Sequence, residues 1–457
     1  MAAMPSGPRM PQIPAILPRG KGHQFVVYGD ACSGVPGAPH EENFGAVNAV
    51  VRRLVPQPEF IIFPGDEIIG LTVDAPQLLA QWRHWLTNEM GWLDRRNVPV
   101  WHSTGNHTTY DEMSEAVFRD VLDLPRNGPD GQEGLAYWVR DGDLLMVFVH
   151  TLCTNLGGEG YVETRWLRDV LRAHADARHK LVIGHHPAFT VNGYGGPYQR
   201  ELGPEVASDF WDALVAAGVC AYLCSHILAF DVQVHRGVLQ ICTAGAGTAH
   251  RMPEGIEYLH CVQMALDAEG LRYQVLDLEG RIREGLTWPP THAPTPGILL
   301  PDGHIRAPCR FPSNNDQCLV LRFQGRAASP GSSGIQTLLS TCGADGLAPL
   351  WIGLRGEEQR LTAIVNAETG RSPHYWIGPE IEVAKDFDIH LMLHAGMGPG
   401  GIMVKEAAGW TSLASASAWG LERLRPSESW IVGHAQQGPN DCPFRGIALK
   451  SFIGFHS

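Results

Sequence analysis

Short apolar runs alternate with segments of helical periodicity from residue 24 to about residue 286. Short apolar runs bounded by turn residues are typical of buried strands, and apolar residues spaced three or four apart indicate the buried face of a helix. Their alternation predicts an α/β layered domain. The runs cover 25–28, 60–63, 98–101, 144–149, 180–184, 219–224 and 238–247, and the helical segments cover 47–55, 75–93, 114–122, 164–175 and 208–218.

The pattern changes after a proline-rich stretch, TWPPTHAPTPGILL, at residues 287–300. Beyond it, apolar runs such as 318–323, 335–340 and 350–354 are separated by Gly, Pro, Asn and Ser, and no long helical pattern occurs. Many short strands with turn signals predict an all-β sandwich of the jelly-roll type. We therefore expect four parts: a tail (1–20), an α/β domain (21–286), a stiff linker (287–300) and a β-sandwich (301–457).

Charge and hydropathy exclude several classes of function. The 457 residues include 48 acidic and 35 basic side chains, which gives a formal charge of −13. Such a chain lacks the basic stripe that binds nucleic acid or anionic lipid. No apolar run reaches the roughly 18 residues that a transmembrane helix needs. The N-terminal residues carry no secretory signal pattern, so we expect a cytoplasmic protein, with export as an alternative.

Metal-type ligands follow five of the expected strands, one after another along the chain. One such residue at the end of a strand is usually a turn former or a helix cap. Five in order within one domain indicate a metal site, because loops at strand ends are where α/β sheets place their chemistry. The residues are Asp30, Asp66, Asn106 with His107, His185 with His186, and Ser225 with His226.

This set of side chains suits a metal-dependent hydrolase. Carboxylates and imidazoles hold divalent ions, and one carboxylate can bridge two ions about 3.5–4 Å apart. An amide such as Asn106 ligates through oxygen without adding charge. A histidine beside the ions that is not a ligand can protonate a leaving oxygen.

Residues 24–250 resemble the calcineurin-like metallophosphoesterase superfamily, and within it the purple acid phosphatase type. The matching motifs are Asp30, Gly65-Asp66, Gly105-Asn106-His107, His185-His186-Pro187 and Ser225-His226. The resemblance implies hydrolysis of a small phosphomono- or phosphodiester by a metal-bound hydroxide, with one or two Fe, Zn or Mn ions. It implies Asp66 as the bridging carboxylate and His107 as the general acid. Asn106, His185 and His226 would be ligands of one metal, and Asp30 a ligand of the other.

Several positions depart from the family pattern. Leu228 stands where the last motif usually has a second histidine, and Ile69 stands where purple acid phosphatases have a tyrosine ligand. Cys32 replaces the histidine that other members have two residues after the first aspartate, and Thr108 replaces an acid that orients the catalytic histidine. Ser225 replaces a glycine, which is a milder change. One metal position is therefore expected to be complete and the other altered.

Three interpretations of the altered position stay open. The chain holds one metal; or Cys32 rebuilds the second position as a thiolate ligand, helped by Glu67, Asp231 or His250; or the site is inactive and the domain only binds. Among further candidates, His150, His250 and Arg251 are expected to bind substrate. His186 is expected to point away from the metal by strand alternation.

The C-terminal residues 429–455 resemble concanavalin-like and laminin-G type jelly rolls, in a glycine-rich turn followed by the strand sequence SFIGF. The resemblance implies that this part binds a glycan or a protein. The alternative function is accordingly a catalytically weak or inactive phosphoesterase scaffold that acts as a binding module.

Overall fold

The structure is a computed structural model of the chain. It describes residues 11–153, 158–192, 201–247, 256–290, 298–300, 303–305, 318–343, 348–366, 372–416, 420–421, 427, 429–435 and 442–456. No helix among these residues is long and apolar enough to cross a membrane.

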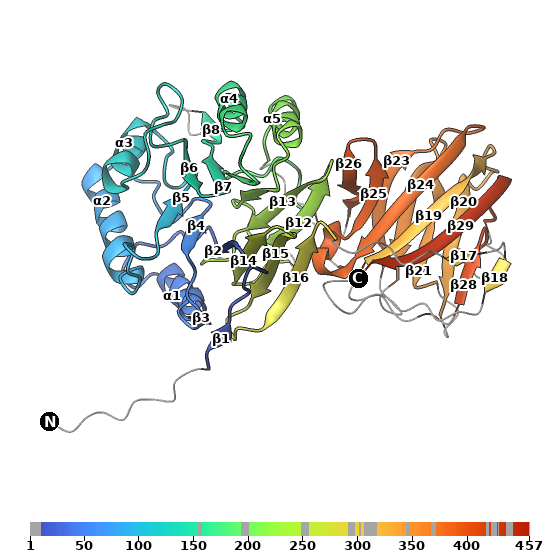
Figure 1. Cartoon of the computed structure of the whole chain (residues 1–457), viewed down its shortest axis with the longest axis horizontal. Coiled ribbons are helices and arrows are strands. Elements are labelled where there is room, and N and C mark those ends of the chain that lie inside the picture. The colour runs from blue at the N-terminus through green and yellow to red at the C-terminus, as the bar shows by residue number, and fades with distance from the viewer. Residues whose placement is uncertain are drawn as a thin grey trace.

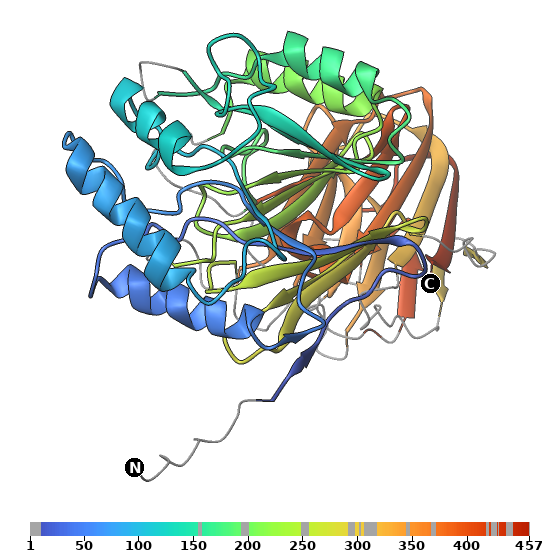
Figure 2. The ribbon, with the colours of Figure 1, turned by 60° about the vertical axis from the view of Figure 1, so that its left-hand side comes forward.

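Two six-stranded sheets face each other in the N-terminal part (Figures 1 and 2). The first has the order β16-β15-β14-β2-β4-β5, with β2 (Gly22–Val27), β4 (Phe60–Phe63), β5 (Val100–His102), β14 (Cys261–Asp267), β15 (Gly270–Leu276) and β16 (Ile282–Trp288). The second has the order β12-β13-β11-β10-β7-β6, with β6 (Tyr137–Asp141), β7 (Leu144–Phe148), β10 (His179–Ile183), β11 (Ala221–Cys224), β12 (Phe230–His235) and β13 (Val238–Thr243). Strands β2, β4 and β5 run parallel in the first sheet, and β7, β10, β11 and β13 run parallel in the second.

Helices cover the outer face of each sheet. On the first sheet lie α1 (Pro39–Val51), α2 (Ala75–His84), the π-helical turn η1 (Trp85–Glu89) and α3 (Glu112–Val121); on the second lie α4 (Thr164–Ala173) and α5 (Pro204–Ala216). Local sequence explains where these helices begin. Pro39 and Pro204 occupy the first turns of α1 and α5, and Asp111 caps α3 by accepting a hydrogen bond from the Ser114 amide at 2.7 Å.

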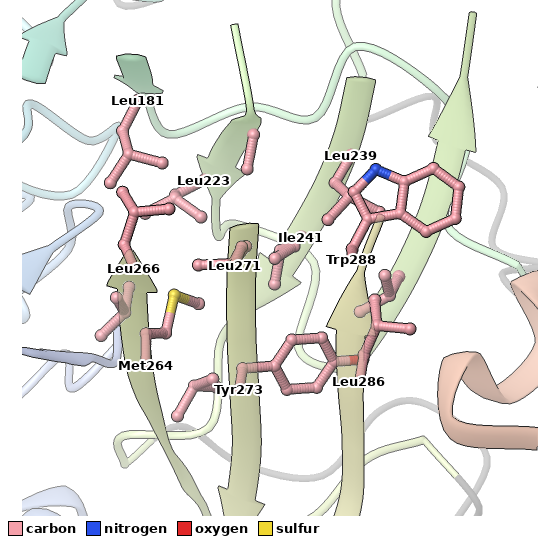
Figure 3. Close-up of a cluster of buried hydrophobic side chains, with 14 of the residues drawn as sticks. Leu181, Leu223, Leu239, Ile241, Met264, Leu266, Leu271, Tyr273, Leu286 and Trp288 are labelled. Carbon is pink, nitrogen blue, oxygen red and sulfur yellow. The ribbon is translucent and has the colours of Figure 1, made fainter. Parts of the chain in front are cut away.

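A single apolar layer joins the two sheets. Figure 3 shows side chains of the second sheet against those of the first, and all of them are buried: Leu181, Leu223, Leu239 and Ile241 against Met264, Leu266, Leu271, Tyr273, Leu286 and Trp288. The burial of these apolar side chains is the main force that holds the two sheets together. The predicted α/β fold is confirmed, with helices, sheet, sheet and helices as its layers. Short pairs complete this part: β1 (Ile13–Pro14) with β3 (Leu54–Val55), and β8 (Leu152–Cys153) with β9 (Gly158–Glu159).

The C-terminal part is two stacked sheets around a second apolar core that includes Trp376 and Trp430. Its first sheet has the order β17-β29-β19-β24-β25-β26, with β17 (Ile298–Leu300), β19 (Cys318–Ala327), β24 (Asp386–His394), β25 (Ile402–Glu406), β26 (Gly409–Ser412) and β29 (Gly446–His456). Its second has the order β18-β28-β20-β21-β22-β23-β27, with β18 (Gly303–Ile305), β20 (Ile335–Cys342), β21 (Leu350–Arg355), β22 (Arg360–Val365), β23 (His374–Glu380), β27 (Ala414–Ser415) and β28 (Ser429–Val432). This strand-rich arrangement is consistent with a β-sandwich.

The boundaries of strands differ in detail from the expected domain limits. The sequence places the linker at 287–300, but β16 extends to Trp288 and β17 begins at Ile298. Residues 13–14 of the expected tail pair with β3. Cross-strand hydrogen bonds extend the sheets into segments whose proline content alone predicted loops.

The two parts pack closely along one edge of the N-terminal sheets (Figure 1). The turn η2 (Ala395–Gly400) lies against β12 and β16, and Met397 joins the apolar layer between the sheets. Tyr273 donates a hydrogen bond to the Gly396 carbonyl at 3.1 Å, and the Val234 amide donates to Ser412 Oγ at 3.0 Å. The C-terminal part therefore covers a portion of each edge strand, where backbone groups would otherwise be unpaired.

This contact depends on glycine in η2. A Cβ added at Gly400 would lie 1.9 Å from the Val232 carbonyl oxygen of β12, which is backbone and cannot rotate away. We expect Gly400→Ala to lower the thermal unfolding temperature through about 1–3 kcal/mol of overpacking strain. The matched control is Gly45→Ala in α1, where an added Cβ meets no atom within 4 Å and alanine should raise the unfolding temperature slightly. Equal effects of the two substitutions would contradict this account of the interface.

Candidate metal centre

The five predicted ligand segments meet at one edge of the paired sheets. Asp30 follows β2, Asp66 follows β4 and Asn106 follows β5, while His185 follows β10 and His226 follows β11. The carboxyl ends of these parallel strands point to the same side, so residues far apart in the chain come together. Asp30, Asp66 and His185 are buried, whereas Asn106 and His226 are half-buried and leave the group open on one side.

Unusual backbone conformations hold several of these residues in place. Asp30, Cys32, Asp66 and His226 have φ values of 57°, 42°, 59° and 66°, in the left-handed region that favours glycine. Such conformations cost free energy in non-glycine residues and persist only where surrounding contacts enforce them. Their concentration at four positions of one cluster is typical of a functional site.

Asp66 lies at the centre of the cluster. Its Oδ1 accepts a hydrogen bond from the His107 amide at 2.8 Å, and its Oδ2 lies 3.1 Å from His185 Nε2. A Cβ at Gly105 would lie 2.1 Å from Asp66 Oδ1, so only glycine allows this approach. The GD and GNH motifs therefore fit together through direct contact between Asp66 and the backbone of the second motif.

Three ligand atoms from other segments lie close to His185 Nε2. His185 Nε2 lies 3.1 Å from Asp66 Oδ2, 3.0 Å from Asn106 Oδ1 and 3.1 Å from His226 Nδ1. His185 Nδ1 lies 2.9 Å from the Pro64 carbonyl and donates to it, which directs Nε2 towards these atoms. Ligand atoms about 2.1 Å from an ion are separated by about 3.0–3.4 Å. The donor set and its spacing therefore fit a divalent metal ion.

The charges of the cluster support the same conclusion. Burial raises the pKa of Asp30 to about 6, against the lowering effect of His185. Burial would also raise the pKa of Asp66, but the charges of His185 and His107 and their hydrogen bonds outweigh it and lower the pKa. Burial would lower the pKa of His185, but Asp66 raises it to about 9. A proton on His185 thus balances two buried carboxylates, and a metal ion would take the place of that proton.

A second group of ligand atoms shares Asp66. Cys32, Asp66 and His107 each offer one ligand atom, and these atoms lie within 4.8 Å of one another. Asp30, Asp66 and His185 form another such group. Two residues considered as helpers of Cys32 have other partners: Glu67 pairs with His102 at 2.7 Å, and Asp231 accepts from Gln233 at 2.8 Å. Neither belongs to the group of ligand atoms that holds Cys32.

Two hydrogen bonds of the cluster involve positions where the sequence departs from the family pattern. His107 Nδ1 donates to the Ile69 carbonyl at 2.8 Å, so a backbone oxygen orients this histidine while Thr108 bonds within its own turn. The Ser225 hydroxyl donates to Asp30 Oδ2, which also accepts from the His226 amide at 2.8 Å. Residue types alone could not indicate the Ile69 contact, because every residue has a carbonyl.

The expectation for His186 was wrong. Strand β10 ends at Ile183, so side-chain alternation does not extend to residue 186. A ring nitrogen of His186 lies within 4.8 Å of ligand atoms of His185 and His226, and its Nδ1 lies 2.8 Å from Thr151 Oγ1. His186 therefore lies in the cluster, beside the imidazoles of His185 and His226.

Of the three residues expected to bind substrate, the structure describes His150 only. His150 is fully buried, with Nδ1 2.8 Å from Thr104 Oγ1 and Nε2 4.0 Å from Glu115. A side chain without exposed surface does not meet a substrate in this conformation, so the placement of His150 does not support that role. His250 and Arg251 lie outside the described residues.

Residues 23–230 match the family model described as calcineurin-like phosphoesterase. The chain carries a calcineurin-like phosphoesterase domain. The match covers every ligand segment from Asp30 to His226. No curated protein matches the chain.

Solved structures of similar arrangement include three proteins of low identity. A purple acid phosphatase from yellow lupin (Lupinus luteus) is 12% identical, covers 59% of this chain and 54% of its own, and has a TM-score of 0.45. A putative 5'-nucleotidase from Staphylococcus aureus is 12% identical (56% and 54% covered, TM-score 0.38), and GAP50 of the Plasmodium inner membrane complex is 15% identical (58% and 88% covered, TM-score 0.40). The chain thus spans about half the length of the lupin and S. aureus proteins.

The buried state of His150 predicts a pH dependence of stability. Burial, with a smaller effect from Arg119, lowers the pKa of His150 from 6.5 to about 3. The neutral His150 side chain therefore contributes fully to the free energy of unfolding above pH 6.5. This contribution is lost as the pH falls from 6.5 towards 3, and at pH 5 the free energy of unfolding is lower by about 2 kcal/mol. We expect urea unfolding midpoints at pH 7.5 and pH 5 to differ less in His150→Gln than in the wild type. His390→Gln, at a half-buried residue of the C-terminal part, should keep the wild-type difference, and an unchanged difference in His150→Gln would contradict the prediction.

Proposed function

We propose that the chain is a metal-dependent phosphoesterase that hydrolyses small phosphomono- or phosphodiesters. The observation that supports the proposal is the set of three ligand atoms within 3.1 Å of His185 Nε2, together with His107, which offers a ligand atom near that of Asp66. When bound, one or two divalent ions supply Lewis-acid chemistry, polarising phosphoryl oxygens and lowering the pKa of water.

The side chains of the cluster would have two roles, metal binding and proton donation. Asn106, His185 and His226 hold the ion together with Asp66, and the Pro64 carbonyl keeps the His185 ring in the required tautomer. His107 is half-buried, and its Nδ1 donates to the Ile69 carbonyl, so Nε2 would be the atom that meets the substrate. From there it would give its proton to the leaving oxygen of the ester.

We further propose that Asp66 is shared between two metal positions. The second position would use Asp30 and Cys32, since a thiolate is a suitable ligand for zinc or iron. Its support is that Cys32 offers a ligand atom within 4.8 Å of that of Asp66, and that the Asp66 carbonyl accepts from the Cys32 amide at 2.8 Å.

For the C-terminal part we retain the concanavalin and laminin-G resemblance as a proposal. Two stacked sheets around one core are compatible with it. A glycan or a protein would be the ligand class of such a module.

The catalytic role of His107 is tested by activity and metal content measured on the same samples. We expect purified chain with Mn²⁺ or Zn²⁺ to hydrolyse p-nitrophenyl phosphate or bis(p-nitrophenyl) phosphate. His107→Ala should lower kcat by about 10²–10⁴-fold, because a general acid contributes on that scale, with metal content unchanged. Asn106→Ala should instead weaken metal binding, and His390→Ala, in the C-terminal part, should change neither. Full metal occupancy without turnover in the wild type would overturn the enzyme proposal in favour of a binding scaffold.

The shared position is tested by a difference in metal content. We expect Cys32→Ser to hold one equivalent of metal fewer than the wild type by elemental mass spectrometry, because a hydroxyl is a poorer zinc or iron ligand than a thiolate. With Co²⁺, the wild type should show a sulfur-to-metal absorption band that Cys32→Ser lacks. Equal metal content in both proteins, without that band, would contradict the second metal position. The ion held by Asn106, His185 and His226 would then be the one that remains.

A further inference from the structure

A separate group of metal-type ligands lies beside the loop that carries Cys32. Glu41 comes from the first turn of α1, His84 ends α2 and Glu89 ends η1. His84 Nε2 lies 2.6 Å from Glu41 Oε1 and 3.6 Å from Glu89 Oε1. Each of the three side chains offers a ligand atom within 4.8 Å of the other two. None of them belongs to the motifs of the phosphoesterase domain.

One ring nitrogen in this group faces two carboxylates. Nε2 can carry a single proton, and at 2.6 Å that proton belongs to the bond with Glu41. Glu89 Oε1 accepts from Ser33 Oγ at 2.8 Å and from the Gly34 amide at 2.9 Å. Glu89 Oε2 is buried and has no hydrogen-bond partner among the described residues, and the side chain is only 4% exposed. A buried carboxylate oxygen without a partner is costly, and a cation would offset that cost.

The helix backbone departs from α geometry where it brings these ligands together. His84 and Glu89 are five residues apart, and at about 100° per residue an α-helix would turn them about 140° away from each other. The π-helical turn η1, closed by a 2.9 Å bond from the Met90 amide to the Trp85 carbonyl, instead sets them on one side. Such turns are rare and frequently occur at functional sites.

We propose that Glu41, His84 and Glu89 bind a divalent cation, with Zn²⁺ or Mn²⁺ as the class that two carboxylates and one imidazole select. The ion would take the place of the proton between His84 and Glu41. The side chains of Glu41 and His84 are 30% and 15% exposed, which gives an ion a path from solvent and leaves room for water ligands.

The position of the group predicts what the ion would do. Glu89 holds Ser33 and Gly34, and His40 Nδ1 donates to the Cys32 carbonyl at 3.0 Å. The Cys32 amide in turn donates to the Asp66 carbonyl at 2.8 Å. A cation at Glu89 would therefore fix the loop that carries Asp30 and Cys32. This structural cation site goes beyond the proposed phosphoesterase activity and does not depend on it.

The test locates the metal directly and separates this site from the candidate metal centre. Crystals of the full chain equilibrated with Zn²⁺ should show an anomalous peak at the zinc edge that is bonded by Glu41, His84 and Glu89. Glu89→Gln keeps an oxygen to accept from Ser33 and Gly34 but removes the charge, so the peak should disappear while the peak at Asn106, His185 and His226 stays. Asp66→Asn should have the reverse effect.

A solution measurement guards against variants that do not crystallise. Calorimetric titration of the folded Asp66→Asn chain with Zn²⁺ should retain one binding event, and adding Glu89→Gln should weaken it at least tenfold. Glu42→Gln, an exposed neighbour on α1, is the matched control and should change nothing. Absence of the peak in the wild type at saturating Zn²⁺, or unchanged binding in Glu89→Gln, would overturn the proposal.

Discussion

The buried carboxylate of Asp66 is the constraint on which the rest of the site depends. It is 1% exposed, and its charge is offset by a hydrogen bond from the His107 amide and by contact with His185. These partners come from loops of two different sheets, so the carboxylate can be stabilised only when the sheets face each other across their common apolar layer. The cost of burying this charge therefore ties the geometry of the site to the packing of the whole N-terminal part.

Several contacts of the cluster involve groups that the family motifs do not include. Ile69 contributes a carbonyl that orients His107, and Ser225 contributes a hydroxyl to Asp30. His186 adds an imidazole beside His226. Hydrogen bonds depend on the position of a donor or acceptor and little on the residue type that supplies it, so a backbone carbonyl can hold a ring as a side-chain oxygen does.

The C-terminal part has a structural role that is independent of any ligand. Strands β12 and β16 are the edge strands of the two N-terminal sheets on one side, and η2 packs against both. The Val234 amide and the Gly396 carbonyl each find a partner across this contact. The sandwich therefore covers part of both edge strands, while the first residues of β16 stay exposed.

The sequence by itself determined the elements and the residues that follow them. The run at 60–63 is strand β4, and the polar residues after the apolar runs are those that meet at the cluster, because both depend on local periodicity. The antiparallel strands β14 and β15 were not predicted from the sequence. Only the tertiary structure decided that His186 faces inward and that His84 and Glu89 share a side, since these depend on where a strand ends and where a helix changes pitch. Contacts between loops are set by packing across the whole domain, and local patterns do not encode them.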